Sequence, residues 1–241
     1  MGIQTVWQQR TGSIFNERWV RLQPWRGEDI LVTANIGGQV TARDPARGKR
    51  RWQRQLDGWI AAGVAGDDGL AYVGTREGVV VAFNLDDGSE RWRRDVAGEL
   101  LAQPAPSDDY VVVRTVDGRI IALERDDGAR RWTYTSDVPS LSLRGNSRPV
   151  PVPGGVLVGL DNGRLVALQD RVGQPIWESE IQATTGDSPI ARLADIDGSI
   201  GAGRSAIYAA TYQGRLARVR PQDGTIGWSE ELSSYAGLRR D

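Results

Sequence analysis

Two short segments carry the side chains best suited to recognising a partner. In the first, VPSLSLRGNSRPVP at residues 138–151, Leu141 and Leu143 alternate with serines, and Arg144 follows them. In an extended chain both leucines point the same way. An exposed apolar pair beside a guanidinium is typical of the hot spots of protein–protein interfaces. The same alternation also suits the buried side of an inner strand, and the residues alone leave both interpretations open.

The second segment offers two carboxylates. It reads QATTGDSPIARLADIDGS at residues 182–199, and its Asp195 and Asp197 have the spacing of side chains on one face of a strand. They could attract a basic patch of a partner, hold Arg144 in place, or cap a turn. A calcium loop is disfavoured, because the EF-hand pattern needs further ligands and a terminal Glu that the following GSIGAGRS lacks. We therefore predict no metal site here.

Composition excludes several kinds of chemistry. The 241 residues include no cysteine and no histidine, which excludes disulfides, Cys-ligated zinc, iron–sulfur clusters, thiol nucleophiles and His-based triads. The formal net charge is -1, and phosphate binding needs a clustered basic excess, so we expect no nucleic-acid partner. The basic run GKRRWQR at residues 48–54 is read as a solvated strand face. No apolar run approaches the roughly 18 residues of a membrane helix, so we expect no direct membrane span.

Both segments interrupt a repeat that runs through the chain. DDGSERW at residues 86–92 returns as DDGARRW at residues 126–132, and alignment on the tryptophan gives five copies. Each copy has one glycine four residues before its tryptophan and another fourteen residues before it. The copies end at Trp52, Trp92, Trp132, Trp177 and Trp228, with the nearer glycines at Gly48, Gly88, Gly128, Gly173 and Gly224 and the farther ones at Gly38, Gly78, Gly118, Gly163 and Gly214.

Each copy has the pattern of a series of β-strands. A run rich in β-branched and aliphatic residues lies between its glycines, such as VVVAF at residues 79–83, and another, LAYVGT at residues 70–75, precedes the first glycine. Around the tryptophan, apolar and polar residues alternate, as in RWRRDV at residues 91–96. The first glycine marks a hairpin turn. Each unit therefore holds at least three antiparallel strands, with room for a fourth.

A four-stranded unit of about 40–45 residues is the blade of a β-propeller. The sequence predicts an all-β fold, a single partial β-propeller domain over residues 1–241 with about five blades present. The repeated tryptophans are predicted to be buried as plugs between adjacent blades. VWQQRTG at residues 6–12 looks like the last strand of a blade, so residues 1–12 are expected to form a closing strand that pairs with C-terminal strands.

The spacing of the copies indicates where extra residues leave the sheets. From Trp52 to Gly78 there are 26 residues, whereas Trp132 to Gly163 spans 31 and Trp177 to Gly214 spans 37. The surplus falls on the segments at 138–151 and 182–199. A third surplus lies in the N-terminal copy, around FNERWVRLQPW. Insertions in a repeat map to loops, often on one binding face.

Over nearly its whole length the chain resembles the BamB family, the propeller lipoproteins of the outer-membrane β-barrel assembly machinery. The resemblance is most specific at PSLSLRGNSRP and IARLADID. It implies an eight-bladed periplasmic propeller, without enzymatic activity or cofactor, that docks on the POTRA domains of BamA and assists the insertion of outer-membrane proteins. It also implies that Leu141, Leu143 and Arg144 form the docking loop and that Asp195 and Asp197 lie on a neighbouring loop of the same face. Unfolded outer-membrane proteins are further candidate partners.

The sequence also departs from the family pattern. The lipid-modified N-terminal cysteine is absent, so a lipid anchor at the periplasmic face of the outer membrane is expected only of the full-length protein, and about three more blades are expected after Asp241. Two other functions stay open: a generic quinoprotein-like propeller that binds a partner or ligand, and a fragment of a pyrroloquinoline-quinone dehydrogenase. The enzyme is the weaker alternative. Such dehydrogenases resemble one another in a vicinal disulfide and calcium-binding acidic residues, whereas this chain has no cysteine and its acidic residues mostly lie in the repeated turns.

Overall fold

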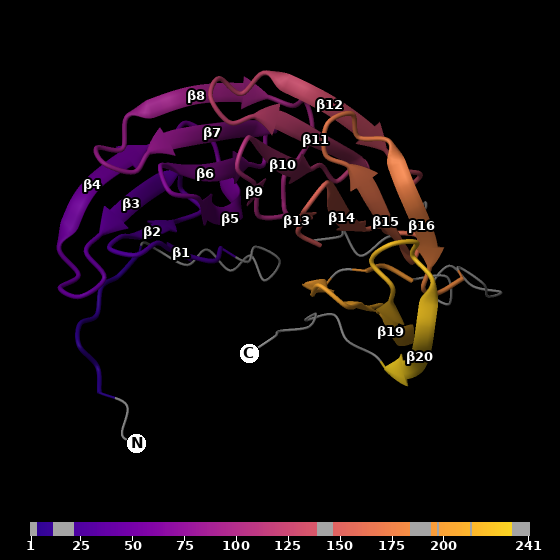
Figure 1. Cartoon of the computed structure of the whole chain (residues 1–241). Coiled ribbons are helices and arrows are strands. Elements are labelled where there is room, and N and C mark those ends of the chain that lie inside the picture. The colour runs from indigo at the N-terminus through magenta and orange to yellow at the C-terminus, as the bar shows by residue number, and fades with distance from the viewer. Residues whose placement is uncertain are drawn as a thin grey trace. The chain divides into compact units, whose positions relative to one another are not determined.

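The computed structural model describes residues 4–11, 22–138, 147–183, 194–196, 198–212 and 214–232. Within these ranges every regular element is a β-strand, and the strands form five four-stranded antiparallel sheets (Figure 1). In each sheet the strands lie side by side in chain order. The predicted all-β fold of four-stranded propeller blades is confirmed.

The five sheets follow one another along the chain. The first contains β1 (Trp25–Arg26), β2 (Leu31–Ala34), β3 (Gln39–Arg43) and β4 (Arg50–Gln55). The second contains β5 (Ile60–Gly66), β6 (Leu70–Thr75), β7 (Val79–Asn84) and β8 (Glu90–Asp95). The third contains β9 (Ala105–Pro106), β10 (Tyr110–Arg114), β11 (Arg119–Glu124) and β12 (Arg130–Thr135). The fourth contains β13 (Val150–Val152), β14 (Gly155–Gly159), β15 (Arg164–Gln169) and β16 (Pro175–Glu180), and the fifth contains β17 (Gly201–Ala202), β18 (Ile207–Ala210), β19 (Gly214–Val219) and β20 (Ile226–Leu232).

The chain forms two compact units. Met1–Tyr110 with Glu124–Ala129 make the first unit, and Val111–Leu123 with Arg130–Asp241 make the second. Each unit has a core of apolar side chains from neighbouring sheets. The core of the first includes Trp52, Ile60 and Phe83, and that of the second includes Trp177, Ile196 and Val219. The single domain over residues 1–241 stays a prediction.

The tryptophan on the last strand of one sheet packs against a glycine-containing turn of the next sheet. The ring of Trp52, on β4, lies against Gly88 in the turn between β7 and β8, and its indole N–H donates a hydrogen bond to the Leu85 carbonyl at 2.7 Å. Gly88 has a φ of +71°, and a Cβ at this position would stand 2.5 Å from Cδ2 of Trp52. Glycine satisfies both the left-handed backbone and the close approach. We call this arrangement the tryptophan–turn contact.

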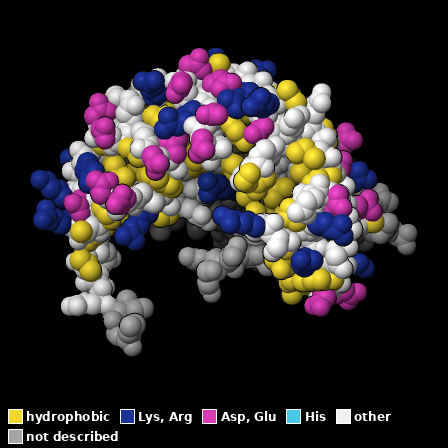
Figure 2. All heavy atoms as spheres, in the orientation of Figure 1, with side chains coloured by type: hydrophobic (Ala, Val, Ile, Leu, Met, Phe, Trp, Pro, Cys, Tyr) yellow, Lys and Arg dark blue, Asp and Glu magenta, His cyan; other side chains and the backbone are white. Residues whose placement is uncertain are grey.

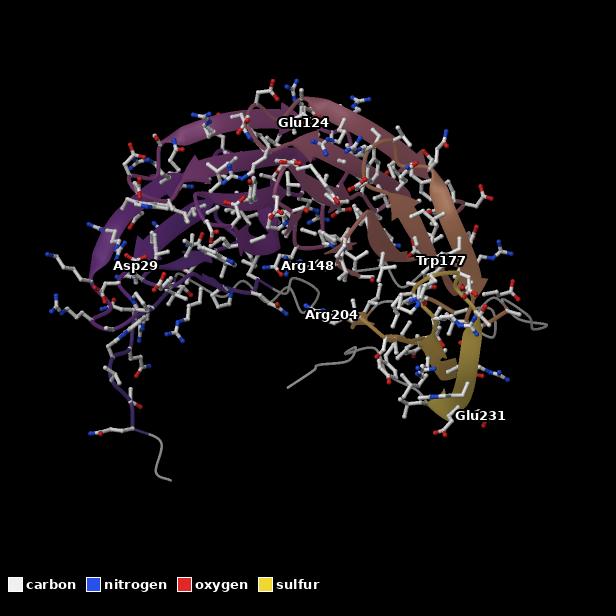
Figure 3. The ribbon with its side chains drawn as sticks, in the orientation of Figure 1. Asp29, Glu124, Arg148, Trp177, Arg204 and Glu231 are labelled. Carbon is white, nitrogen blue, oxygen red and sulfur yellow. The ribbon has the colours of Figure 1, made fainter. Side chains whose placement is uncertain are left out.

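The tryptophan–turn contact recurs in both units. In each instance the indole N–H donates to a main-chain carbonyl at 2.7–2.9 Å. The pairs are Trp7 with Pro45, Trp52 with Leu85 and Trp92 with Arg125 in the first unit, and Trp132 with Asp170 and Trp177 with Pro221 in the second. Figure 3 labels Trp177, on β16. Trp7 makes this contact although residues 4–11 form no strand, and the closing role of residues 1–12 stays a prediction.

The predicted burial of the repeated tryptophans is wrong for Trp228. Exposure is 5%, 6%, 6% and 9% at the four earlier tryptophans but 40% at Trp228. Within the described part of the chain no later glycine turn covers the Trp228 ring, which meets Tyr208 of its own sheet at a centroid distance of 6.2 Å. A blade-ending tryptophan is therefore buried by the turn of the following sheet and not by its own strand.

The carboxylate of Asp67 is a second link within the first unit. In the turn between β5 and β6 it accepts hydrogen bonds from the N–H groups of Gly69 and Leu70 and from the Tyr72 hydroxyl, at 2.8–2.9 Å. Nε and Nη2 of Arg125 donate two more, at 2.9 and 3.0 Å. Burial would raise the pKa of Asp67, but these hydrogen bonds outweigh it and hold the pKa below its ordinary value.

The tryptophan–turn contact can be tested at its glycine. Gly88→Ala should lower the free energy of unfolding by about 2–4 kcal/mol, because it adds left-handed strain to a clash with the Trp52 ring. Gly154→Ala is the matched control: its φ is +78°, but no atom lies within 4 Å of the added Cβ, so strain alone should cost about 1 kcal/mol. Chemical denaturation of both variants measures the difference. Equal losses would show that the ring imposes no constraint.

The Asp67 network predicts a dependence on pH. Because the folded-state pKa lies below the unfolded value of about 3.9, the stabilisation is present above about pH 4 and is lost as the pH falls through the folded-state pKa. Asp67→Asn should cost about 1–3 kcal/mol at neutral pH, and its difference from wild type should shrink below about pH 4. Denaturation at several pH values measures this. The exposed neighbour Asp68→Asn should stay within about 0.5 kcal/mol throughout. A pH-independent loss at Asp67 would contradict this account.

Candidate functional site

Of the predicted partner-binding residues, the structure describes one. Leu141, Leu143, Arg144 and Asp197 lie outside the described residues. Asp195 is fully buried, and its main-chain carbonyl accepts a hydrogen bond from the N–H of Tyr212 at 3.0 Å. The role of all five in binding a partner stays a prediction.

The two inserted segments are nevertheless joined near their C-terminal ends. Ser147, near the end of the first segment, donates a hydrogen bond from its hydroxyl to the carbonyl of Gly198, near the end of the second, at 3.4 Å. The Ser147 side chain is fully buried. Residues 51 positions apart therefore meet at one place within the second unit. The C-terminal ends of two insertions that the sequence predicts as separate loops therefore lie together.

The second segment is also attached to the turn between β14 and β15. The N–H of Ile196 donates to the carbonyl of Leu160 at 3.2 Å. The Ile196 side chain lies directly against Gly159, where any Cβ would collide with it. Absence of a side chain at Gly159 thus lets the segment around Asp195 pack closely on the fourth sheet.

A buried ion pair also holds that turn. Arg114, the last residue of β10, donates from Nη1 to the Gly159 carbonyl at 2.9 Å and pairs through Nη2 with the Asp161 carboxylate. The two side chains are 2% and 3% exposed. Removal of one partner of a buried ion pair strongly destabilises the fold, because the other charge is left buried and uncompensated. We refer to Ser147, Gly198, Ile196, Arg114 and Asp161, with the 159–161 turn, as the platform.

Sequence reasoning missed Arg114 and Asp161, although the repeat contained a signal. Four residues before the farther glycine, the other copies have small residues, whereas the third copy has arginine in YVVVRT. The equivalent positions are Ala34, Gly74, Gly159 and Ala210. A lone arginine at a position that is otherwise Ala or Gly indicates a specific buried partner.

Arg148 adds a second guanidinium to the end of the first segment. It directly follows Ser147 and stands just before β13; Figure 3 labels it. Burial lowers the pKa of its guanidinium from the ordinary value. Arginine still remains charged near neutral pH, so the base of this segment carries a permanent positive charge.

The platform is suited to holding loops. Its polar groups bond to main-chain carbonyls or to one another.

Among the described residues no three Asp, Glu, His or Cys side chains gather where they could hold a metal ion. Basic and acidic side chains are interspersed on the face shown in Figure 2, without a large patch of one sign. The described ranges also contain no helix with the length and apolar character needed to cross a bilayer.

Comparisons of the sequence point to one family. The protein-family model described as outer membrane protein assembly factor BamB matches residues 36–241. The chain is 39% identical over 240 residues to outer membrane protein assembly factor BamB of Escherichia coli K12, covering 95% of this chain and 61% of that protein. It is 44% identical over 232 residues to BamB of Pseudomonas aeruginosa, covering 96% and 61%. The chain thus spans about three fifths of the length of these curated relatives.

Solved structures agree on the fold. BamB from Moraxella catarrhalis superposes with a TM-score of 0.85 at 33% identity, over 90% of this chain and 66% of that chain. Quinohemoprotein alcohol dehydrogenase from Comamonas testosteroni superposes with a TM-score of 0.72 at 15% identity, over 89% and 43%. At such low identity the likeness to the dehydrogenase concerns the fold alone.

The platform yields a stability prediction. Arg114→Ala or Asp161→Ala should each lower the free energy of unfolding by about 3–5 kcal/mol, because each leaves a buried charge without its partner. The double replacement Arg114→Met with Asp161→Leu should recover most of that loss. Arg220→Ala breaks the exposed pair with Asp223 and should cost at most about 1 kcal/mol. Urea denaturation measures all four, and single losses no larger than that of the exposed pair would contradict the assignment.

Proposed function

Because the chain belongs to the BamB family of outer membrane protein assembly factors, we propose that it is a non-enzymatic scaffold that docks on the periplasmic POTRA domains of BamA. The joined base of the two inserted segments is the observation that best supports this. Both segments that resemble the family's docking loops end on one buried platform, where Ser147 meets Gly198. Two loops whose C-terminal ends meet can present one binding surface.

In this proposal the two segments divide the work of binding. Leu141 and Leu143 remove apolar surface from water at roughly 25 cal/mol per Å². Arg144 forms a forked pair with a carboxylate of the partner. Asp197 attracts basic residues of the partner. Asp195 is buried, so we assign it to holding the second segment in place and not to direct contact.

We further propose that the protein acts at the periplasmic face of the outer membrane. There it assists the insertion of outer-membrane proteins, whose unfolded chains are candidate partners. The relatives are named as assembly factors, which supports a role without catalysis or cofactor. Because this chain spans about three fifths of those relatives, the role and any lipid anchor are proposed for the whole protein.

The docking residues can be tested by charge substitution. Leu143→Glu places a charge in an apolar contact, and Arg144→Glu opposes a partner carboxylate, so each should weaken binding to the POTRA domains of BamA by about thirtyfold or more. Calorimetric titration measures the affinity, and thermal melting should remain near wild type. Val172→Glu alters an exposed apolar residue between β15 and β16 and should leave both unchanged.

The same variants distinguish a docking loop from a buried strand. If Leu143→Glu lowers the melting temperature by many degrees while Arg144→Glu leaves binding untouched, the leucines belong to the core. The docking assignment would then be wrong.

A further inference from the structure

A second surface suited to protein recognition lies in the first unit, around Trp59. Trp59 is 50% exposed, between buried Leu56 and buried Ile60. It stands in the connection from β4 to β5, the same place in the repeat as residues 136–149 between β12 and β13. In the next copy the equivalent residue, seven positions after the blade-ending tryptophan, is Glu99. The repeat itself therefore does not require an indole here.

The main chain holds Trp59 in one position. Its N–H donates to both carboxylate oxygens of Glu77, at 3.3 and 3.2 Å. Its carbonyl accepts a hydrogen bond from the N–H of Arg76 at 2.8 Å, and the N–H of Ile60 donates to the Ile36 carbonyl at 3.2 Å. A side chain on such a fixed backbone loses little further freedom when a partner binds.

Arg76 partly covers the indole. Its Cζ lies 5.9 Å from the ring centroid of Trp59, and its Nε lies 3.0 Å from Oε1 of Glu99. Tryptophan and arginine are the residue types that most often dominate interface energetics. The arrangement is therefore a preformed aromatic and cationic pair whose remaining ring surface faces solvent.

The charges around the ring indicate the chemistry of the partner. Glu99 pairs with Arg76, Glu77 accepts a hydrogen bond from the Trp59 N–H, and exposed Asp57 stands two residues before Trp59. Together with Arg76, these residues carry three carboxylates and one guanidinium. An incoming cation is attracted both by excess negative charge and by the face of an indole. We propose that Trp59, Arg76, Asp57, Glu77 and Glu99, the Trp59 surface, bind a partner segment that presents a Lys or Arg beside an apolar side chain. This inference rests on the proposed function, because the Trp59 surface is a second contact with the POTRA domains of BamA.

Calorimetric titration with the POTRA domains of BamA tests the Trp59 surface. Trp59→Ala should weaken binding by about tenfold to thirtyfold, because a central tryptophan contact is lost, and Trp59→Phe should recover part of the affinity. Asp57→Asn should reduce the dependence of binding on salt, because one attractive charge is removed. All three variants should melt near the wild-type temperature.

An exposed apolar residue elsewhere provides the matched control. Ile176 on β16 is 54% exposed, close to the value for Trp59, so Ile176→Ala should leave the affinity unchanged. A loss equal to that of Trp59→Ala would mean that binding does not single out the Trp59 surface, and the proposal would be overturned.

Arg144→Glu separates this inference from the docking proposal. If Arg144→Glu weakens binding and Trp59→Ala does not, docking stands and the Trp59 surface is wrong. If the wild-type chain does not bind the POTRA domains, both are wrong. If Trp59→Ala weakens binding only to an unfolded outer-membrane protein, the surface belongs to substrate and our assignment of its partner is overturned.

Discussion

The rest of the structure depends on an indole ring that needs a glycine beneath it. A strand with alternating polar and apolar residues cannot bury a tryptophan by itself, and the next turn must come close enough to cover the ring and accept its N–H. Gly88 permits this through a left-handed backbone and the absence of Cβ. Trp228 illustrates the dependence, since the same residue in the same strand position is exposed where no described turn covers it. Burial is thus a property of two successive sheets.

Two ion pairs are added to this repeat at particular turns. Arg114 replaces the small residue found in the other copies, and its guanidinium fixes the turn on which the segment around Asp195 rests. Asp67 and Arg125 play a comparable role in the first unit, because one carboxylate gathers donors from two parts of the chain. The uniform repeat stacks the sheets, whereas these two ion pairs each fix one turn.

The features that repeat were predictable from the sequence, and those that arise from one pair of residues were not. Glycine and tryptophan spacing gave the blades, the hairpins and the positions of both insertions, because the same local physics is sampled in every copy. The partner of Arg114 lies 47 residues away, and no spacing rule links the two. The alternation of Asp195 and Asp197 left partner contact, a bond to Arg144 and a turn cap all open, and it did not indicate that Asp195 is fully buried where Ile196 lies against Gly159. Leu141, Leu143 and Arg144 lie outside the described residues, so their interpretation rests on the sequence.

The two ends of each fourth strand have different freedom to evolve. In the first sheet, β4 begins just after the turn at Gly48, which takes part in a tryptophan–turn contact, and ends at the connection that carries Trp59. The turn before each fourth strand keeps a fixed length, because a tryptophan ring packs against its glycine. The connection after the strand can lengthen at a cost of only about 0.6 kcal/mol for each doubling of its length. New recognition sequences can therefore be acquired, lost or grafted at one end without disturbing how the sheets stack.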